Sequence, residues 1–533
     1  MKNKLSIFSL SLIIIFGAFL YFYKISSIPS SVYDDEATIG YNAYCILTNL
    51  KDEYGKFLPI AFRFFGAYTP PLYVYLTVPL IKLFGVTAFS IRFLSVVSTL
   101  FGIIIVYFFI KEFKVFKNPS TKIIGSLLFT VLPWTVFNAR LGYEVTLGYI
   151  TFAAASLFLW QGIKQQKISL LAIFLFSIST YIAHTERYLV PIFLFTFLII
   201  FRQSIFIKKN KTNLLLSLLI IIVTQIPNLF LITTKAFWVK NSSINTNLYI
   251  LSSDLINQLL TYFSPKTLFG LTPDINLQHS IPYQSFFYSW MIIPFFIGLY
   301  LIFKNIKKSE IKYLLLLFLT APIPGSLSGH FISVQRILTL IIPMILIISL
   351  GIDFISQKIK PIFFIPLFSL LIGFSLILLW RGYFIFLPKE RATWWSYGYG
   401  QLSEIITQEQ DKNFIIDNGR TGSIYMLILY YTQYSPQKLQ QQFSSEFIKN
   451  YYSNPPFNPN YKFGNSEIRP INWKDDTLKD TIIVGDPLAI SDKQAKEHCL
   501  TKEFEIKDPL GKIVLTGYQT NPKRKIPGGC KSL

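Results

Sequence analysis

The stretch Asp34-Asp35-Glu36 places three carboxylates in a row, shortly after the first long apolar segment of the chain. A charge buried in hydrocarbon without a partner is costly, so these side chains must lie in water or in a polar cleft. A carboxylate at such a boundary can act as a general base on a hydroxyl or amine, and a neighbouring carboxylate can orient that acceptor or bind a divalent ion. The alternative is a solvated helix start, which Asp34 would cap.

Further charged side chains stand near the ends of other apolar segments. Arg140 and Glu144 have the spacing of neighbours on a helix face, so they could bind substrate or simply pair with each other. Arginine binds phosphate through its planar fork, but it also anchors helices at membrane interfaces. The residues that we expect to bind substrate are Arg63, Arg140, Glu144, His184, Glu186, Arg187, His330 and Arg336.

A set of carboxylates together with Arg and His suits a reaction that needs a base at one point and an anion-stabilising group at another. Transfer of a group from a lipid phosphate has that demand, because the base activates the acceptor while cations stabilise the departing phosphate. No glycine-rich nucleotide-binding motif is present where it would bind a nucleotide. A divalent ion at the carboxylates is compatible with this chemistry but is not required by it.

The composition defines the elements that must position these residues. Hydrophobic residues make up 52% of the 533 residues, and the mean hydropathy is +0.45. This excludes a soluble chain and indicates a polytopic α-helical membrane protein with the lipid bilayer as its partner. The net charge of +22 arises from basic clusters between apolar segments, which indicates membrane orientation and not a nucleic-acid partner.

Apolar segments long enough to cross a bilayer recur about eleven times. We expect spans near 5–23, 88–110, 121–138, 145–163, 168–183, 188–203, 212–231, 284–303, 311–323, 337–355 and 361–380. Every other connection carries a cluster of lysines or arginines, on the same side as Lys2 and Lys4. The positive-inside rule therefore places the N-terminus in the cytoplasm of a multi-pass cell-membrane protein.

The opposite, outer side is expected to hold the first loop, 24–87, and the polar tail. In that loop, 37–50 is predicted to form a short helix, and 70–84 an interfacial helix in preference to a full span. Strand-like and helix-like segments alternate in the tail, which predicts a small α/β domain. The domains are therefore 1–381, transmembrane, and 382–533, extracytoplasmic. The three cysteines have neither the number nor the spacing of a disulfide framework.

Several motifs together resemble a known family. Asp35-Glu36-Ala37 after the first span, Pro70-Pro71-Leu72-Tyr73, and Gly85 followed by Phe89-Ser90-Ile91-Arg92 are similar to the polyprenyl-phosphate-sugar-dependent glycosyltransferases of the C-type membrane fold. These are relatives of protein O-mannosyltransferases and lipid A aminoarabinose transferases. The first ~110 residues carry the most specific part of the resemblance, and the later spans match in layout.

The resemblance implies inverting transfer of a sugar, hexosyl or pentosyl, from a polyprenyl-phosphate donor to a hydroxyl or amine of an unidentified protein, lipid or glycan acceptor. Asp35 would be the general base, with Glu36 and Asp34 beside it as catalytic candidates. The segment 394–398, Trp-Trp-Ser-Tyr-Gly, is similar to the Trp-Trp-Asp-Tyr-Gly signature of oligosaccharyltransferases, but Ser396 replaces the aspartate. We therefore place that activity lower.

Two other classes are alternatives. A transporter or flippase for a lipid-linked sugar would carry charges near the bilayer midplane and show a repeated half, whereas here the charges gather at one boundary and no repeat is evident. A non-enzymatic binding protein would use the tail as an outer docking domain. Covalent transfer of a labelled sugar by the purified protein distinguishes both from the enzyme.

Overall fold

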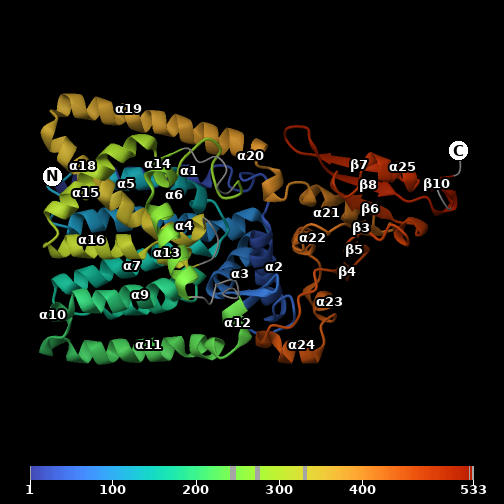
Figure 1. Cartoon of the computed structure of the whole chain (residues 1–533), viewed down its shortest axis with the longest axis horizontal. Helices are drawn as coiled ribbons and strands as arrows, with labels where there is room; N and C mark the ends of the chain where they lie inside the picture. The colour runs from blue at the N-terminus through green and yellow to red at the C-terminus, as the bar shows by residue number, and fades with distance from the viewer. Residues whose placement is uncertain (1, 240–247, 271–276, 328–332, 527–528, 531–533) are drawn as a thin grey trace. The chain divides into compact units, whose positions relative to one another are not determined.

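The computed structural model describes residues 2–239, 248–270, 277–327, 333–526 and 529–530, which form two compact units (Figure 1). The first unit comprises Met1–Ile25, Tyr68–Leu76 and Arg92–Ile385, and the second comprises Ser26–Ala67, Thr77–Ile91 and Phe386–Leu533. The second unit thus combines most of the first outer loop with the tail. The predicted domain boundary after residue 381 divides the chain into two continuous segments, whereas each of these units combines several segments. That boundary stays a prediction.

The first unit is helical. Its helices are α1 (Lys2–Phe22), α4 (Ala88–Glu112), α5 (Thr121–Val131), α6 (Pro133–Ala139), α7 (Glu144–Lys164), α8 (Leu170–Ser179), α9 (His184–Ile200), α10 (Arg202–Ile205), η1 (Lys208–Asn210), α11 (Lys211–Ile232), α12 (Lys235–Trp238), α13 (Leu248–Phe263), α14 (Pro265–Phe269), η3 (Ser289–Met291), α15 (Ile292–Lys304), α16 (Ser309–Thr320), α17 (Ile323–Ser326), η4 (Val334–Leu340), α18 (Ile341–Lys358), α19 (Pro361–Leu379) and η5 (Trp380–Phe386). Each of the eleven predicted spans overlaps one of these helices. The predicted polytopic helical class is confirmed.

Not all of these helices are long enough to cross a bilayer alone. Among the described residues, six are long and apolar enough, or seven if α5 and α6, which meet at a bend of 59°, form one span. The helices α3 (Leu72–Phe84) and α8 are apolar but shorter. The count of eleven spans therefore stays a prediction, while α3 has the short length expected of an interfacial helix.

Helix α18 forms the centre of the first unit, because its apolar residues surround the helix on all sides and are buried along nearly its whole length. It packs closely on α15 through two glycines. A Cβ on Gly351 would lie 1.9 Å from the carbonyl oxygen of Pro294, and one on Gly298 would lie 2.1 Å from that of Ile347. Small residues that bring helix backbones together are typical of membrane helix packing.

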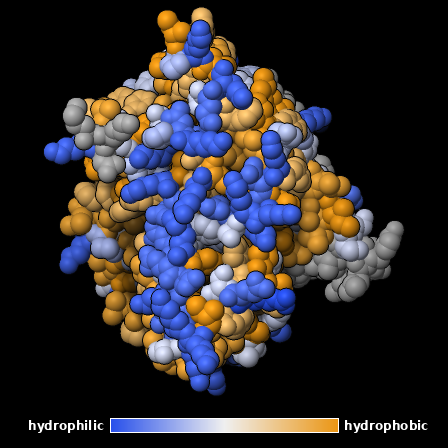
Figure 2. All heavy atoms as spheres, turned by 90° about the vertical axis from the view of Figure 1, so that its left-hand side faces the viewer, coloured by the Kyte–Doolittle hydropathy of each residue, from blue (hydrophilic) through white to orange (hydrophobic). Residues whose placement is uncertain are grey.

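One face of the first unit is basic. Figure 2 shows hydrophilic side chains gathered in a band over the face that lies on the left of Figure 1, where α10 joins α9 to α11. The connections between helices at this face carry the exposed cations that the positive-inside argument used, which are Lys114, Lys117, Lys164, Lys167, Arg202, Lys208, Lys209, Lys211, Lys304, Lys307, Lys308, Lys312, Lys358 and Lys360. They lie in the turns between apolar helices or in the adjoining helix ends, as the sequence pattern indicated.

The second unit is built around a six-stranded sheet in the order β4-β5-β3-β6-β8-β7. The central strand β3 (Phe414–Ile416) runs parallel to β5 (Ser466–Ile468) and β6 (Ile482–Gly485), and the outer pairs are antiparallel. The remaining strands are β1 (Phe62–Phe64), β2 (Ala67–Thr69), β4 (Tyr461–Phe463), β7 (Thr501–Lys507), β8 (Ile513–Gln519), β9 (Lys525–Ile526) and β10 (Gly529–Cys530). The predicted α/β character of the tail is confirmed.

Helices of the second unit accompany this sheet. They are α2 (Asp34–Asn49), α20 (Leu387–Glu390), η6 (Thr393–Trp395), α21 (Tyr399–Gln408), α22 (Ile424–Thr432), α23 (Pro436–Gln440), α24 (Ser445–Lys449), η7 (Tyr451–Ser453), η8 (Asp476–Leu478), α25 (Asp492–Glu497) and η9 (Pro522–Arg524). Helix α2 packs on α22, and α22 packs on α21. The helix expected at 37–50 is therefore present and begins three residues earlier.

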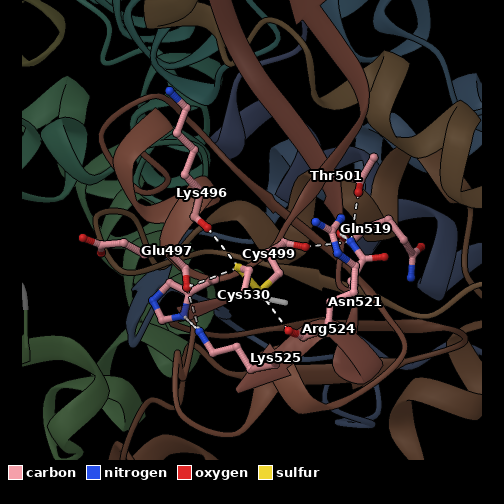
Figure 3. Close-up of a disulfide and its surroundings, with 10 residues drawn as sticks. Lys496, Glu497, Cys499, Thr501, Gln519, Asn521, Arg524, Lys525 and Cys530 are labelled. Carbon is pink, nitrogen blue, oxygen red and sulfur yellow. Dashed lines mark hydrogen bonds between the residues drawn. A yellow bond between two sulfur atoms is a disulfide. The ribbon is translucent and has the colours of Figure 1, made fainter. Parts of the chain in front are cut away.

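The interpretation of the cysteines was wrong for two of the three. Cys499 and Cys530 form a disulfide across a separation of 31 residues (Figure 3). Asn521 Nδ2 donates to the carbonyl of Cys499 at 2.7 Å, and Lys525 Nζ lies 2.7 Å from His498 Nδ1. The bridge fastens the end of the chain to the segment after α25. Two cysteines this far apart in the sequence cannot be recognised as a disulfide pair from their spacing, because the folding of β7 against β8 brings them together.

Candidate active site

The three carboxylates form the first turn of α2. Glu36 Oε2 accepts a hydrogen bond from the backbone N–H of Tyr33 at 3.2 Å, which satisfies a donor at the helix start. Asp34 Oδ1 accepts from the N–H of Asp35 at 3.0 Å. Glu36 is 1% exposed, whereas Asp34 and Asp35 are half-buried. Among the three, the two aspartates are therefore the ones that solvent or a substrate can reach, and all three lie at the positive end of the helix dipole.

Segments distant in sequence surround this helix start. The ring of Tyr33 meets that of Trp395 edge to face at 5.9 Å, and the Ser31 hydroxyl donates to the carbonyl of Ser396 at 3.4 Å. Tyr431 binds the residues just before α2, since its hydroxyl lies 2.9 Å from that of Ser31 and accepts from the N–H of Val32 at 3.1 Å. The tail therefore fixes the point at which the acidic helix begins.

The environment of Asp34 favours its neutral form. Burial raises the pKa of Asp34 above its usual value, although the Ser423 hydroxyl and the backbone N–H of Asp35 donate to the carboxylate and oppose the shift. A carboxyl with a raised pKa gives up its proton nearer neutral pH, which is the range in which a general base works best. Ser423 is the residue directly before α22. A residue of the tail therefore also influences the pKa of Asp34.

Close packing holds α2 against the tail along one side. A Cβ on Gly40 would lie 2.7 Å from the ring of Tyr430 and 2.7 Å from Ile91 Cδ1, so only glycine fits without displacement of these neighbours. Two residues further on, Asn42 Oδ1 accepts from the N–H of Glu53 at 3.1 Å. Tyr41 donates from its hydroxyl to the carbonyl of Tyr434 at 2.9 Å. The helix is thus tied to α22 and to the loop that follows α2.

A second acidic pair in the same loop, Asp52-Glu53, was not predicted from the sequence and is fully buried. Asp52 Oδ2 accepts from the hydroxyl of Tyr451 at 2.6 Å, and burial raises the pKa of Asp52 to about 6. Burial also raises the pKa of Glu53 well above its usual value, and the charge of Asp52 raises it further. The sequence did offer a signal for this pair, because Asp52-Glu53 stands beside Tyr54-Gly55 and close to Arg63.

Arg63 lies in this buried cluster. Its guanidinium is 5.7 Å from the ring centre of Tyr54 and 5.3 Å from that of Phe447, and it donates to the carbonyl of Pro455. Arg63 therefore makes cation–π contacts with two aromatic rings of the protein. Its side chain is 1% exposed. Arg63 as a substrate ligand stays a prediction, and the contacts that the structure gives it are with the protein.

In the first unit the structure brings Glu144 and Glu186 together. Glu144 begins α7 and Glu186 lies in the first turn of α9, and the two buried carboxyl groups interact electrostatically. Gly148 makes room for the second, because a Cβ there would lie 2.9 Å from Glu186 Oε2. Two adjacent carboxyl groups resist simultaneous ionisation. Glu144 and Glu186, both predicted as substrate ligands, are therefore close enough to influence each other, and their role as ligands stays a prediction.

The helical pairing considered for Arg140 and Glu144 was wrong. Helix α6 ends at Ala139 and α7 begins at Glu144, so a break in the backbone replaces the shared helix face. Arg140 Nη1 donates to the carbonyls of Leu20 at 3.0 Å and Tyr21 at 2.7 Å. The guanidinium is fully buried near the rings of Tyr383 and Phe384. These contacts tie the end of α1 to η5.

The remaining predicted ligands lie at other helix ends of the first unit. His184 Nε2 lies 2.6 Å from the carbonyl oxygen of Tyr68, and Arg187 Nε donates to the carbonyl of Thr180 at 3.1 Å. Arg336 lies in η4, near the hydroxyl of Tyr262. His330 lies outside the described residues. The predicted convergence of these side chains with the acidic turn of α2 joins residues of both units and stays a prediction.

A metal site is not evident among the residues that the structure describes. No group of three or more His, Cys, Asp or Glu side chains within them is arranged to hold an ion.

The comparisons with known proteins agree with one another. Residues 68–230 match the family described as dolichyl-phosphate-mannose-protein mannosyltransferase. The fold is similar to that of ArnT from Cupriavidus metallidurans bound to undecaprenyl phosphate, with 11% identity, a TM-score of 0.55, and coverage of 95% of this chain and 97% of that one. The same ArnT in the apo state gives a TM-score of 0.54 at 11% identity, over 95% and 97% of the two chains.

A second kind of enzyme has a similar fold. The oligosaccharyltransferase of Archaeoglobus fulgidus in its apo form gives a TM-score of 0.50 at 11% identity, over 97% of this chain and 74% of that one. No curated protein matches the sequence. The structure thus has the C-type membrane glycosyltransferase fold. The predicted resemblance to the polyprenyl-phosphate-sugar-dependent glycosyltransferases, relatives of the protein O-mannosyltransferases, is confirmed.

Proposed function

We propose that the protein transfers a sugar from a polyprenyl-phosphate carrier to a hydroxyl or amine acceptor, with inversion at the anomeric carbon. The observation that carries this proposal is the acidic turn of α2, where two half-buried aspartates stand at a helix start outside every candidate span. The family match over 68–230 and the lipid phosphate in the similar ArnT structure support the donor class.

In the proposed reaction Asp35 is the general base. Its carboxylate accepts the proton of the acceptor group while the acceptor oxygen or nitrogen forms a bond to the anomeric carbon. The bond from that carbon to the phosphate oxygen breaks, and the polyprenyl phosphate leaves with the bonding pair. Asp34 shares the first turn with Asp35, so its charge influences the base, and Glu36 holds the turn through its bond to Tyr33.

We further propose that the acidic turn and the tail lie on the outer side of the cytoplasmic membrane. The exposed cations of the basic face lie in the turns between helices of the first unit or at the adjoining helix ends, and the positive-inside rule assigns such connections to the cytoplasm. The disulfide of Cys499 and Cys530 belongs to the second unit, and such bonds persist in oxidising compartments. Two independent features therefore support this orientation.

The test is sugar transfer by the purified protein in proteoliposomes. Undecaprenyl phosphate carrying labelled mannose, glucose or aminoarabinose is supplied in parallel, with membrane lipids and membrane proteins as acceptors. The expected result is a labelled acceptor and free undecaprenyl phosphate with one of the donors, and an inverted linkage by NMR. Counterflow of an intact labelled donor without any covalent transfer would contradict the proposal and favour a flippase.

Replacement of the base gives the decisive variant. Asp35→Asn should lower the transfer rate by about 100-fold or more, because loss of a general base typically costs 10²–10⁴-fold. Asp411→Asn is the matched control, since Asp411 is an exposed aspartate of the same unit. A folded Asp35→Asn protein with full activity would remove Asp35 from the mechanism.

A further inference from the structure

An apolar cavity of about 230 Å³ lies within the first unit, among the ends of α7, α8, α9 and α11. Most of its wall is aliphatic or aromatic, including Leu159, Ile163, Phe197 and Leu214. It exceeds the roughly 150 Å³ of an apolar cavity that accepts a benzene molecule, so it has room for several methylene groups. A cavity of this character in a membrane protein suits part of a hydrocarbon chain.

One end of the cavity is cationic. Lys167 lines it directly, and Asn210 lines it beside the basic turn η1. The two connections at this end, 164–169 and 201–212, contain six cations and no acidic residue, namely Lys164, Lys167, Arg202, Lys208, Lys209 and Lys211. Lys164 forms an ion pair with Glu112 of α4, whereas Lys167 is exposed at the cavity. The charge is complementary to an anionic head group.

The mouth of the cavity is held in shape by Asn210, which is 1% exposed. Its Oδ1 accepts from the N–H of Ile168 at 3.3 Å, and its Nδ2 donates to the carbonyl of Ile205 at 3.1 Å. These two bonds connect the turn between α7 and α8 with the turn between α9 and α11. The cationic end is therefore a built structure and not a chance gathering of loose loops.

One side chain of the cavity wall, Ser217, carries a polar group without a partner among the described residues. The hydroxyl of Ser217 lies on α11, lines the cavity and is 7% exposed, and it forms no hydrogen bond within the part of the chain that the structure describes. A buried hydroxyl without a partner is unfavourable. The Ser217 oxygen is almost fully enclosed, so an acceptor in the cavity satisfies it when the side chain turns toward the cavity. The carbonyl oxygen of a fatty-acid ester is such an acceptor, and it lies between a phosphate and an acyl chain.

We propose that this cavity binds an anionic phospholipid, with one acyl chain in the cavity, an ester carbonyl accepting from Ser217 and the phosphate beside Lys167. The site is separate from the acidic turn of α2 and takes no part in the sugar transfer proposed above. The bound lipid fills the space beside α11, a helix whose length is mostly exposed and which packs mainly on α8. It thereby stabilises the position of α11 in the first unit.

The test uses the full-length protein in nanodiscs and a phosphatidylglycerol with a photoreactive group on one acyl chain. After irradiation, the labelled peptides of α7, α9 and α11 are identified by mass spectrometry, and unlabelled phosphatidylglycerol and phosphatidylcholine are compared as competitors. Labelling of these peptides should be displaced several times more effectively by the anionic lipid. Equal displacement by both lipids would overturn the proposal, because the basic end would then contribute nothing.

Variants separate the head-group contact from the chain contact. Lys167→Gln should reduce the preference for phosphatidylglycerol about fivefold, the effect of one basic residue near a membrane surface. Lys167→Arg should retain it. Lys307→Gln, which removes an exposed lysine from the turn between α15 and α16, is the matched control and should change nothing. A Lys167→Gln protein with unchanged preference contradicts the proposed phosphate position.

Filling the cavity is the second test. Ser217→Leu places a larger apolar side chain in the cavity and removes the hydroxyl, so the labelling of α11 by either lipid should fall at least several-fold while the melting temperature shows that the protein remains folded. Persistent labelling of α11 in this variant would overturn the proposal. Stronger displacement by undecaprenyl phosphate than by phosphatidylglycerol would also overturn it, and would assign the cavity to a donor lipid.

Discussion

The two aspartates of the acidic turn differ from Glu36 in what they can do. Glu36 is buried and engaged with the backbone of Tyr33, so it supports the helix start, while Asp34 and Asp35 are open enough to meet a substrate. The sequence alone showed that three carboxylates must avoid hydrocarbon. It did not show which carboxylate would accept a hydrogen bond from the backbone of the first helical turn, because that depends on the residue at which the helix begins.

The hydroxyl of Ser423 offers a test of the acidic turn. Burial raises the pKa of Asp34 and the Ser423 hydrogen bond opposes this shift, so Ser423→Ala should raise that pKa further. If transfer requires an ionised acidic turn, the acidic limb of kcat/KM against pH moves upward by about one pH unit, the equivalent of one hydrogen bond to a charged group. Ser423→Thr keeps a hydroxyl and should leave the limb in place. A downward shift in Ser423→Ala contradicts this account.

Glu53 gives a prediction for stability. Its pKa is raised in the folded protein, so on a rise in pH the unfolded chain loses this proton first, and the free energy of unfolding falls with pH above the unfolded pKa. Glu53→Gln has no carboxyl group to titrate at this position, so it does not lose this part of its stability. Relative to the wild type, the variant should therefore become more stable as the pH rises from 5 to 8. Melting temperatures of both proteins across this range measure the trend.

The control for this series is Asp411→Asn, which alters an exposed carboxylate of the same unit. Asp52 titrates in both the wild type and Glu53→Gln. Its raised pKa makes the free energy of unfolding fall with pH in both proteins, so the difference between them reports on Glu53. A variant that becomes less stable than the wild type as the pH rises would show that Glu53 is ionised in the folded protein, as a partner of Arg63.

Helix α2 shows how residues distant in the sequence fix the position of a helix. Its existence was predictable from residues 37–50, whereas its fixation by Trp395, Ser396 and Tyr431 was not, because nothing local indicates that the tail returns to the first loop. The same reason explains the missed burial of Asp52-Glu53, which Tyr451 of the tail contacts. The disulfide was missed because β7 and β8 bring Cys499 and Cys530 together within the tail. By contrast, hydropathy alone located the apolar helices that overlap the predicted spans, since each apolar run must satisfy its own backbone in the bilayer. It did not locate α13 (Leu248–Phe263), which lies between two predicted spans.

Tyr431 is therefore predicted to position α2. Tyr431→Phe removes the hydroxyl that binds Ser31 and Val32, which should lower the free energy of unfolding by about 1–3 kcal/mol for two hydrogen bonds. Because the aspartates follow directly, kcat should fall by roughly 10-fold with little change in KM. The matched control is Tyr397→Phe, another half-buried tyrosine of this unit. A loss of stability without any loss of kcat would limit Tyr431 to a structural role.

For the whole molecule, orientation in the membrane is the feature on which the other arguments depend. Two reporter sites separate the alternatives, Leu488→Cys in the tail, where the side chain is 81% exposed, and Lys307→Cys in the basic turn between α15 and α16. A membrane-impermeant maleimide should label Leu488→Cys in spheroplasts and Lys307→Cys only in inside-out vesicles, because cationic turns remain in the cytoplasm. Cys45 is buried, and Cys499 and Cys530 are joined, so the native cysteines should react little with the reagent.

The disulfide supplies an internal check on this orientation. A tail exported to an oxidising compartment should keep Cys499 and Cys530 joined until a reductant is added, and a cytoplasmic tail should show both as free thiols. Closure of a loop of this length should stabilise the second unit by about 3–4 kcal/mol, so reduction should lower its melting temperature. Labelling of Leu488→Cys only in inside-out vesicles, together with free thiols at these two positions, would place the acidic turn in the cytoplasm and contradict transfer from an outward-facing lipid carrier.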